Sequence, residues 1–175
     1  TRQIAGLEGR EGVRECVAES PFSYEKNCLL YLPKTLEHCR RGSREEAIMV
    51  ANHIHSLICS TYGHTLVLFT SYTLMGSVYQ ILRDSLPFPM VEVWRHSQEE
   101  ILRFKTMENG VLFAAGFCWE GVDFPGDMVS SLIIVKLPFA VPDPISEAER
   151  ETYDSLESYI RSIIVPDMQK KLRQG

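Results

Sequence analysis

A chain of 175 residues with 45% apolar and 23% charged residues suits one globular domain of ordinary size, and its composition is not that of a disordered protein. The formal net charge of −5 and the lack of a basic block argue against broad electrostatic capture of DNA or RNA by this chain alone. Every apolar run is shorter than the roughly 18 to 20 residues that span a bilayer, so no membrane partner is expected.

Residues 1–42 have no regular pattern, and we interpret them as a lead-in segment that packs on the main domain. Within this segment, 4–20 favours a short helix, and NCLLYLP at 27–33 favours a strand. The charged stretch that follows marks the predicted boundary. The main domain is predicted to cover 43–175 and to be part of a longer protein.

The first regular element of the main domain is a helix predicted over 43–63. Ser43 and Glu46 form an S-x-x-E capping box, and apolar residues recur with a helical period behind it. Gly63 suits the left-handed turn that ends many helices.

Strands and helices then alternate along the chain. Strands are predicted at 65–71, 89–94, 111–116 and 131–139, the last being the strongest. Helices are predicted over 72–85, 96–110 and 146–164, and Pro166 starts a last helical piece. The capping box recurs as Ser97 with Glu100 and as Ser146 with Glu149.

This alternation predicts an α/β fold in three layers, with a mainly parallel sheet and helices on both faces. Ligands of such sheets bind at the carboxyl ends of the strands. The loops 70–72, 116–127 and 137–144 each follow a predicted strand, so they form the candidate site.

Several kinds of site are missing from the sequence. It has no P-loop, no G-x-G-x-x-G after a strand and no G-x-S-x-G elbow. No metal site is predicted, because the five cysteines form no CxxC pair and His53 and His55 point to different helix faces. Reduced thiols indicate a cytoplasmic protein.

Glu120 and Asp123 are either an acid–base pair or members of a solvated turn.

Two residues of the candidate loops have two interpretations each. Ser71, between a strand and a helix, either caps the helix or also holds a phosphate at the helix N-terminus. Trp119 either covers the end of the sheet as a packing residue or stacks against a nucleic-acid strand.

Four stretches carry a resemblance to a known family. They are SPFSYEKNCLLYLP (20–33), LVLFTSYTLMGSVYQIL (66–82), VLFAAGFCWEGVDFPGDMVSSLIIVKLPFAVPDP (111–144) and PDMQKKLRQG (166–175). Together they resemble the second RecA-like lobe of DinG/XPD-type superfamily 2 DNA helicases, with motif IV in the second stretch, motif V in the third and the opening of motif VI in the fourth. The combination of W-E-G-V-D, P-G-D and K-L-P-F is the specific part of the likeness.

The resemblance implies an ATP-dependent DNA helicase that acts in DNA repair in the cytoplasm, in a bacterium at the nucleoid. Its partners would be single-stranded DNA and a first RecA-like lobe, which would hold most of the ATP and Mg²⁺. Near the nucleotide it places Glu120, Gly121, Asp123 and Gln174, with Glu120 and Asp123 in a catalytic role. Beside the DNA it places Thr70, Ser71, Tyr72 and Trp119.

One departure from the family pattern bears on activity. The arginines that follow the Gln–Gly pair in family members are absent, because the sequence ends at Gly175. Without these arginines and without a P-loop, we expect no ATP hydrolysis by this chain alone. A non-catalytic α/β module that binds a nucleotide or a protein is the alternative, and a small hydrolase using Glu120 and Asp123 is a third hypothesis.

Overall fold

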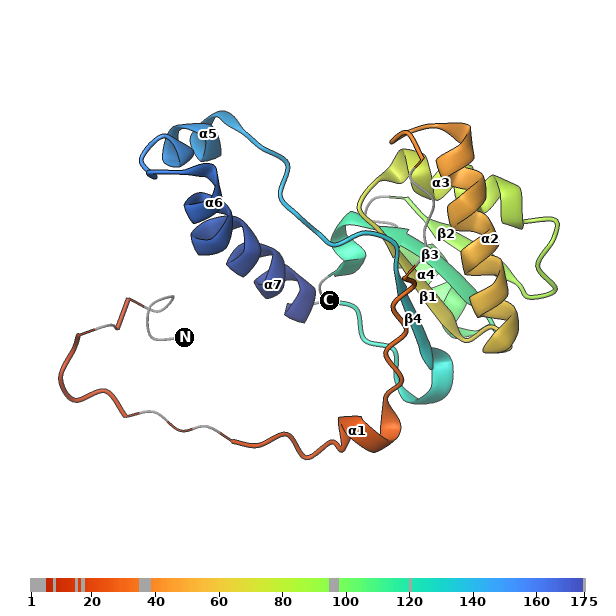
Figure 1. Ribbon diagram of the computed structural model, residues 1–175. Helices are drawn as coiled ribbons and strands as arrows, with labels where there is room; N and C mark the ends of the chain where they lie inside the picture. The colour runs from red at the N-terminus through yellow and green to blue at the C-terminus, as the bar shows by residue number, and fades with distance from the viewer. Residues whose placement is uncertain are drawn as a thin grey trace. The chain divides into compact units, whose positions relative to one another are not determined.

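The computed structural model describes residues 6–174 apart from 8, 15, 17, 35–38, 95–97 and 120, and it leaves the side chains of 117, 118 and 174 undescribed (Figure 1). The chain forms two units, Thr1–Leu36 and Glu37–Gly175. Within the described ranges, no helix combines the length and the apolar character that a membrane crossing requires.

The first unit contains one short helix, α1 (Tyr24–Asn27), in its described part. The predicted helix over 4–20 is wrong, because Gly6, Gly9 and Gly12 all have positive φ angles, which a right-handed helix does not accommodate. The predicted strand over 27–33 is also wrong. Asn27 ends α1, and the following residues pair with no strand in the described chain.

The second unit is built on a four-stranded, all-parallel sheet with the order β2-β3-β1-β4. The strands are β1 (Thr65–Phe69), β2 (Met90–Val93), β3 (Val111–Ala115) and β4 (Ser131–Ile134). Every residue of the central strands β1 and β3 is buried, as their continuous apolar sequences require. β4, predicted to be the strongest strand, is a partly buried edge strand.

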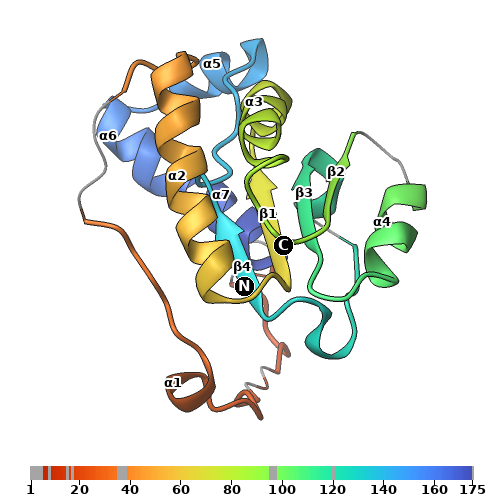
Figure 2. The ribbon, with the colours of Figure 1, turned by 90° about the vertical axis from the view of Figure 1, so that its right-hand side faces the viewer.

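Helices cover both faces of the sheet (Figure 2), which confirms the predicted fold class. On one face, α2 (Arg44–Ser60) and α3 (Tyr72–Leu82) pack on the sheet through a core that includes Ile58, Met75 and Phe113. On the other face, α4 (Gln98–Lys105) packs with Ile101 and Phe104. The link from β3 to β4 contains two 3-10 turns, η1 (Gly116–Trp119) and η2 (Gly126–Met128), instead of a crossover helix.

Two of the predicted helix starts are confirmed. The Ser43 Oγ accepts a hydrogen bond from the Glu46 N–H at 3.1 Å, and the Ser71 Oγ accepts one from the Leu74 N–H at 3.3 Å. The predicted cap at Ser97 lies outside the described residues.

The prediction of one continuous helix over 146–164 is wrong, because this stretch contains two helical runs with a turn between them. Asp143, not Ser146, caps α5 (Pro144–Arg150), since its carboxylate and the Ser146 hydroxyl complete a reciprocal box three residues earlier. The chain then turns, and Ser155 caps a second helical run. That run consists of α6 (Leu156–Tyr159), a π-helical segment η3 (Ile160–Ile164) and α7 (Val165–Gln174). Pro166 is the second residue of α7 and lies inside this run, directly after the π-helical segment, where its missing N–H removes one helical hydrogen bond.

Candidate functional site

The carboxyl edge of the sheet gathers the segments that follow its strands. Because the strands are parallel, Ser71, Trp94, Gly116 and Lys136, which follow β1 to β4, belong to one edge. α3 begins at this edge directly after β1. α2 also begins there, since its end leads into the start of β1. The edge therefore carries two helix N-termini in addition to the four strand ends.

The segment after β1 contains the first group of predicted site residues, Thr70, Ser71 and Tyr72. Thr70 is exposed, whereas Ser71 and Tyr72 are half-buried. The Ser71 hydroxyl satisfies the Leu74 N–H, and the Ser71 carbonyl accepts from the Met75 N–H. The first amides of α3 are still the positive end of its dipole. Ser71 is thus an N-cap.

The loop after β3 lies against the end of β1. The Tyr72 Oη donates a hydrogen bond to the Ala115 carbonyl at 3.4 Å, and the Trp119 Nε1 donates one to the Phe69 carbonyl at 3.0 Å. Gly116 has a φ of +66°, and a Cβ there would come within 2.6 Å of the Tyr72 Oη. The structure thus brings two of the predicted loops, 70–72 and 116–119, into direct contact.

Trp119 is a packing residue in this structure. Its side chain is 2% exposed and belongs to the core between the sheet and α4. Both polar atoms of its hydrogen bond are buried, so the indole is held in place from the ring edge. A ring buried in this way has no open face on which a DNA base could stack. The burial of Trp119 therefore favours the packing interpretation over the stacking one.

The rest of the loop alternates between the core and solvent. Val122 and Phe124 pack on the α4 side, where the Phe124 ring meets Phe104 edge-on at 5.5 Å. Asp123 lies between these two residues and Gly121 directly before them, and both are exposed. Gly121 has a φ of +78°, with no atom within 4 Å of where a Cβ would stand. The loop therefore presents an open backbone and a carboxylate to solvent.

The structure does not describe the side chains of two residues predicted to lie near the nucleotide. Glu120 is not among the described residues, and Gln174 ends α7 with its side chain undescribed. The structure therefore brings together the segments after β1 and β3 but gives no distance between Glu120 and Asp123. Within the described residues, no group of three His, Cys, Asp or Glu side chains could hold a metal ion.

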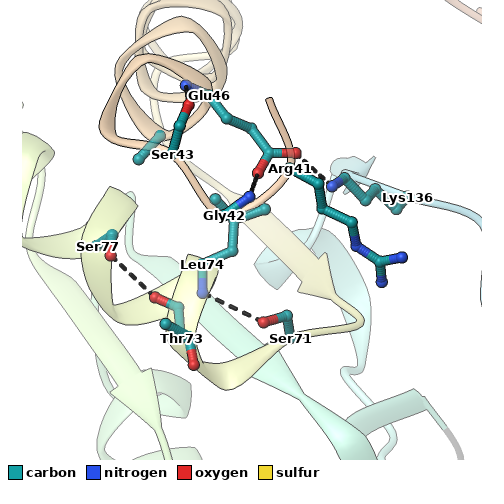
Figure 3. Close-up of a pocket in the computed structure, with 10 residues that line it drawn as sticks. Arg41, Gly42, Ser43, Glu46, Ser71, Thr73, Leu74, Ser77 and Lys136 are labelled. Atoms are coloured by element: carbon teal, nitrogen blue, oxygen red, sulfur yellow. Dashed lines mark hydrogen bonds and ion pairs between the residues drawn. The ribbon is translucent and has the colours of Figure 1, made fainter. Parts of the chain in front are cut away.

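A pocket lies between the N-termini of α2 and α3 (Figure 3). Hydroxyls, two cationic side chains and one carboxylate line it, contributed by Ser43, Ser71, Thr73, Ser77, Arg41, Lys136 and Glu46. The prediction from sequence had included only Ser71 of this group. Thr73 and Ser77 follow Ser71 in α3. The other four come from segments far from α3 in the sequence, and only the fold reveals their proximity to it.

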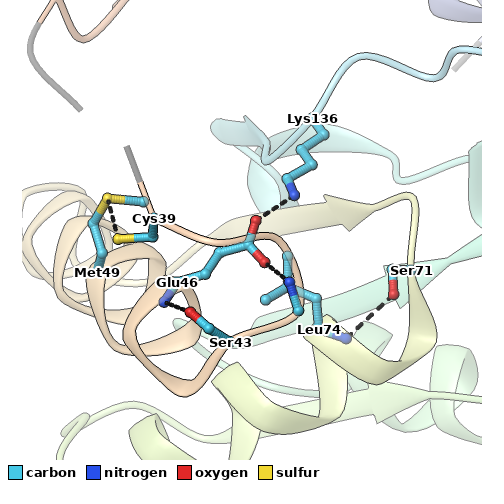
Figure 4. Close-up of polar contacts among 8 residues, drawn as sticks. Cys39, Ser43, Glu46, Met49, Ser71, Leu74 and Lys136 are labelled. Atoms are coloured by element: carbon cyan, nitrogen blue, oxygen red, sulfur yellow. Dashed lines mark hydrogen bonds and ion pairs between the residues drawn. The ribbon is translucent and has the colours of Figure 1, made fainter. Parts of the chain in front are cut away.

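Glu46 and Lys136 join α2 to the segment after β4 (Figure 4). Glu46 is 7% exposed, and its carboxylate accepts from the Lys136 Nζ at 2.5 Å and from the Gly42 N–H at 2.6 Å. The hydrogen bond from Lys136 lowers the pKa of Glu46 from its ordinary value of 4.5, and the Gly42 amide adds to this effect against the opposing effect of burial. The predicted capping box is thus modified, because the Glu46 side chain reaches Gly42 instead of the N-cap amide.

Replacing Lys136 by methionine is expected to lower the free energy of unfolding by about 1 to 2 kcal/mol at pH 7, because a buried carboxylate loses its charged partner. A carboxyl group with a lowered pKa in the folded state contributes stability above its unfolded pKa, and this contribution is lost as the pH falls through the folded pKa. The difference between K136M and the unsubstituted chain should therefore shrink below pH 4.5, the ordinary value for Glu46.

Urea unfolding at several pH values measures this difference. Lys170→Met is the matched control, since Lys170 pairs with Asp167 on the surface at 46% and 54% exposure. It should cost less than about 0.5 kcal/mol. Equal losses in K136M and K170M, or a K136M loss independent of pH, would contradict the assigned role of the buried pair.

The sequence of this chain is similar to those of known proteins. A family model described as "Helicase C-terminal domain" matches residues 54–175. The chain is 32% identical over 184 aligned positions to "ATP-dependent DNA helicase DinG" of Photobacterium profundum, covering 99% of this chain and 26% of the relative. It is 30% identical over 145 positions to "ATP-dependent DNA helicase YoaA" of Escherichia coli, covering 82% and 22%.

A third relative is "3'-5' exonuclease DinG" of Bacillus subtilis, 30% identical over 166 positions, which covers 90% of this chain and 18% of the relative. The chain thus spans about a fifth to a quarter of the length of these curated relatives.

Proposed function

Because this chain belongs to the family of helicase C-terminal domains and matches DinG and YoaA helicases over most of its length, we propose that it forms the second motor lobe of an ATP-dependent DNA helicase. In this role the lobe closes one side of an ATP cleft and contacts one DNA strand during translocation and unwinding. ATP is the substrate, and a first RecA-like lobe holds most of it together with Mg²⁺. The proposal extends to a role in DNA repair in the cytoplasm.

The observation that carries this proposal is the contact between the loops after β1 and β3. Hydrogen bonds from Tyr72 to Ala115 and from Trp119 to Phe69 hold the two loops at one edge of the sheet. A residue that meets DNA in one loop is thereby connected to residues that meet the nucleotide in the other. Such a connection is what a motor needs in order to couple ATP hydrolysis to movement.

Among the described residues, the exposed Gly121 and Asp123 are the ones proposed to contact the nucleotide. The open space beside Gly121 allows a close approach to the backbone. Asp123 offers a carboxylate that can accept hydrogen bonds from a ribose or from an arginine. Glu120 and Gln174 are proposed for the same side from their places in the motifs alone.

On the DNA side, the start of α3 is the proposed phosphate site. Amides at a helix N-terminus favour an anion, and Thr70 and Ser71 add hydroxyls. Arg41 and Lys136, at the pocket beside Ser71, add positive charge. Because this site offers only a few phosphate contacts, we expect weak binding of single-stranded DNA. The affinity should also depend only weakly on salt, since each neutralised phosphate adds about 0.7 to the slope of log K against log salt concentration.

The chain of residues 1–175 is expected to hydrolyse no ATP, since it has no P-loop to hold the nucleotide's phosphates. A phosphate-release assay with Mg²⁺ and single-stranded DNA measures this. Turnover above background that disappears when Asp123 is replaced by asparagine would support the hydrolase hypothesis instead.

Ser71→Asp should abolish most of the binding of single-stranded DNA while leaving the stability of α3 unchanged. Aspartate caps a helix about as well as serine, so the substitution keeps the cap but places a negative charge against the phosphate. Fluorescence anisotropy of a labelled strand gives the affinity, and thermal unfolding gives the stability. The control is Ser155→Asp, the same exchange at the N-cap of α6. If S71D binds the strand as well as S155D does, the proposed phosphate site is wrong.

A further inference from the structure

A stacked aromatic pair lies at the carboxyl edge, formed by the half-buried Tyr72 and the exposed Trp94. Trp94 directly follows β2, and Tyr72 is the first residue of α3 after β1. Their rings stack with centroids 5.6 Å apart and an interplanar angle of 19°. The Trp94 side chain is 47% exposed, in contrast to the 2% of Trp119. The accessible tryptophan at this edge is therefore the one that follows β2.

The surrounding backbone leaves space for both rings. A Cβ on Gly76 of α3 would come within 3.1 Å of the Trp94 six-membered ring, so the absence of a side chain there lets the indole lie close to the helix. Gly116 does the same for Tyr72, whose hydroxyl is held by the Ala115 carbonyl. Segments after β1, β2 and β3 thus build the pair together, and its geometry is set by the fold.

We propose that the Trp94–Tyr72 pair is a stacking platform for a base of the single DNA strand. Tyr72 directly follows Ser71, so the platform adjoins the amides proposed for the phosphate, and one nucleotide presents both groups. The residues around Tyr72 are polar, since Thr70 and Thr73 are exposed. A single flat ring within a polar edge suits one base, whereas a stable protein interface covers about 800 Å² on each partner. The inference rests on the proposed DNA-binding function and adds a contact with the base.

The test compares strands with and without bases. A labelled oligothymidylate of about 12 nucleotides and an abasic strand of equal length carry the same phosphates, and only the first offers rings to stack on. Fluorescence anisotropy measures both affinities for the chain of residues 1–175, for Trp94→Ala and for Trp94→Phe. Tyr62→Ala is the matched control, because Tyr62 is an aromatic residue at the amino edge of the same sheet and is 73% exposed.

W94A is expected to bind the oligothymidylate about fivefold to a hundredfold more weakly, the range for one lost base–aromatic stack, and to bind the abasic strand unchanged. W94F should recover most of the affinity, and Y62A should match the unsubstituted chain. Quenching of the tryptophan emission of the unsubstituted chain by the oligothymidylate, but not by the abasic strand, gives the same answer without any variant.

Binding of both strands by the unsubstituted chain with no dependence on Trp94 overturns this inference alone and assigns the ring to another contact, such as a protein surface. An equal loss for both strands in W94A also overturns it. If the unsubstituted chain binds neither strand, the inference and the proposed function fail together.

Discussion

Replacement of Trp119 by alanine is expected to lower the free energy of unfolding of the second unit by about 3 to 5 kcal/mol, as for other large aromatic residues removed from a core. Trp119 is 2% exposed and packs between the sheet and α4. Its removal leaves a cavity and also deprives the Phe69 carbonyl of its partner at the end of β1. Urea unfolding followed by circular dichroism measures the loss.

Trp119→Phe is the matched variant, because it keeps an aromatic ring and removes the indole N–H. It should cost about 1 to 3 kcal/mol, the penalty for one unsatisfied buried carbonyl. If W119A is as stable as the unsubstituted chain and loses only its affinity for DNA, the packing role is wrong and the stacking interpretation stands.

Replacement of Gly63 by alanine is expected to cost about 3 kcal/mol or more, because the new Cβ meets backbone in a conformation that L-residues avoid. Gly63 has a φ of +81°, and its Cβ would stand 2.1 Å from the Asn109 carbonyl oxygen. The turn between α2 and β1 and the turn between α4 and β3 must therefore move apart at the amino edge of the sheet. The unfolding free energy in urea gives the size of the effect.

Gly126→Ala separates the cost of the left-handed backbone conformation from the cost of the clash between the new Cβ and the neighbouring backbone. Gly126 has a φ of +67°, but no atom lies within 4 Å of its would-be Cβ. This variant should cost about 1 to 2 kcal/mol, the penalty for the left-handed conformation alone. Equal losses in G63A and G126A would show that the backbone at Gly63 relaxes without cost and that the close approach has no role in stability.

The parts of the fold that depend on local patterns could be predicted from sequence. Ser43 and Ser71 cap their helices as expected, because an N-cap needs only the amides of the following turn. The buried central strands β1 and β3 were also correctly predicted, since each is a continuous apolar run between turns.

The errors arise where two local patterns compete or where a partner is missing. Asp143 and Ser146 both fit a helix start, and the reciprocal box with proline at the first helical position decides for Asp143. Leu29 and Leu32 suit a strand by composition, yet they are exposed and have no neighbouring strand in the described chain. A strand requires a partner, which no local pattern supplies.

The location of the candidate site at the carboxyl edge of the sheet could be predicted from the sequence. Which side chains are exposed there, and which of them pair, could not. Trp94 ends one predicted strand and Trp119 lies just after another, and nothing local distinguishes an exposed ring from a buried one. The difference comes from η1, which ends at Trp119 and allows its indole to reach the Phe69 carbonyl. The pair of Glu46 and Lys136 joins residues 90 positions apart and has no signature in the sequence.

The most direct test of the central claim is a map of amide chemical shifts of the chain, recorded by NMR during titration with single-stranded DNA. The method detects the weak binding expected for one lobe. The account predicts shifts at the carboxyl edge, around Ser71, Trp94 and Gly116, and none at the amino edge around Tyr62 and Asn109. Shifts concentrated at the amino edge, or no shifts at millimolar DNA, would contradict it.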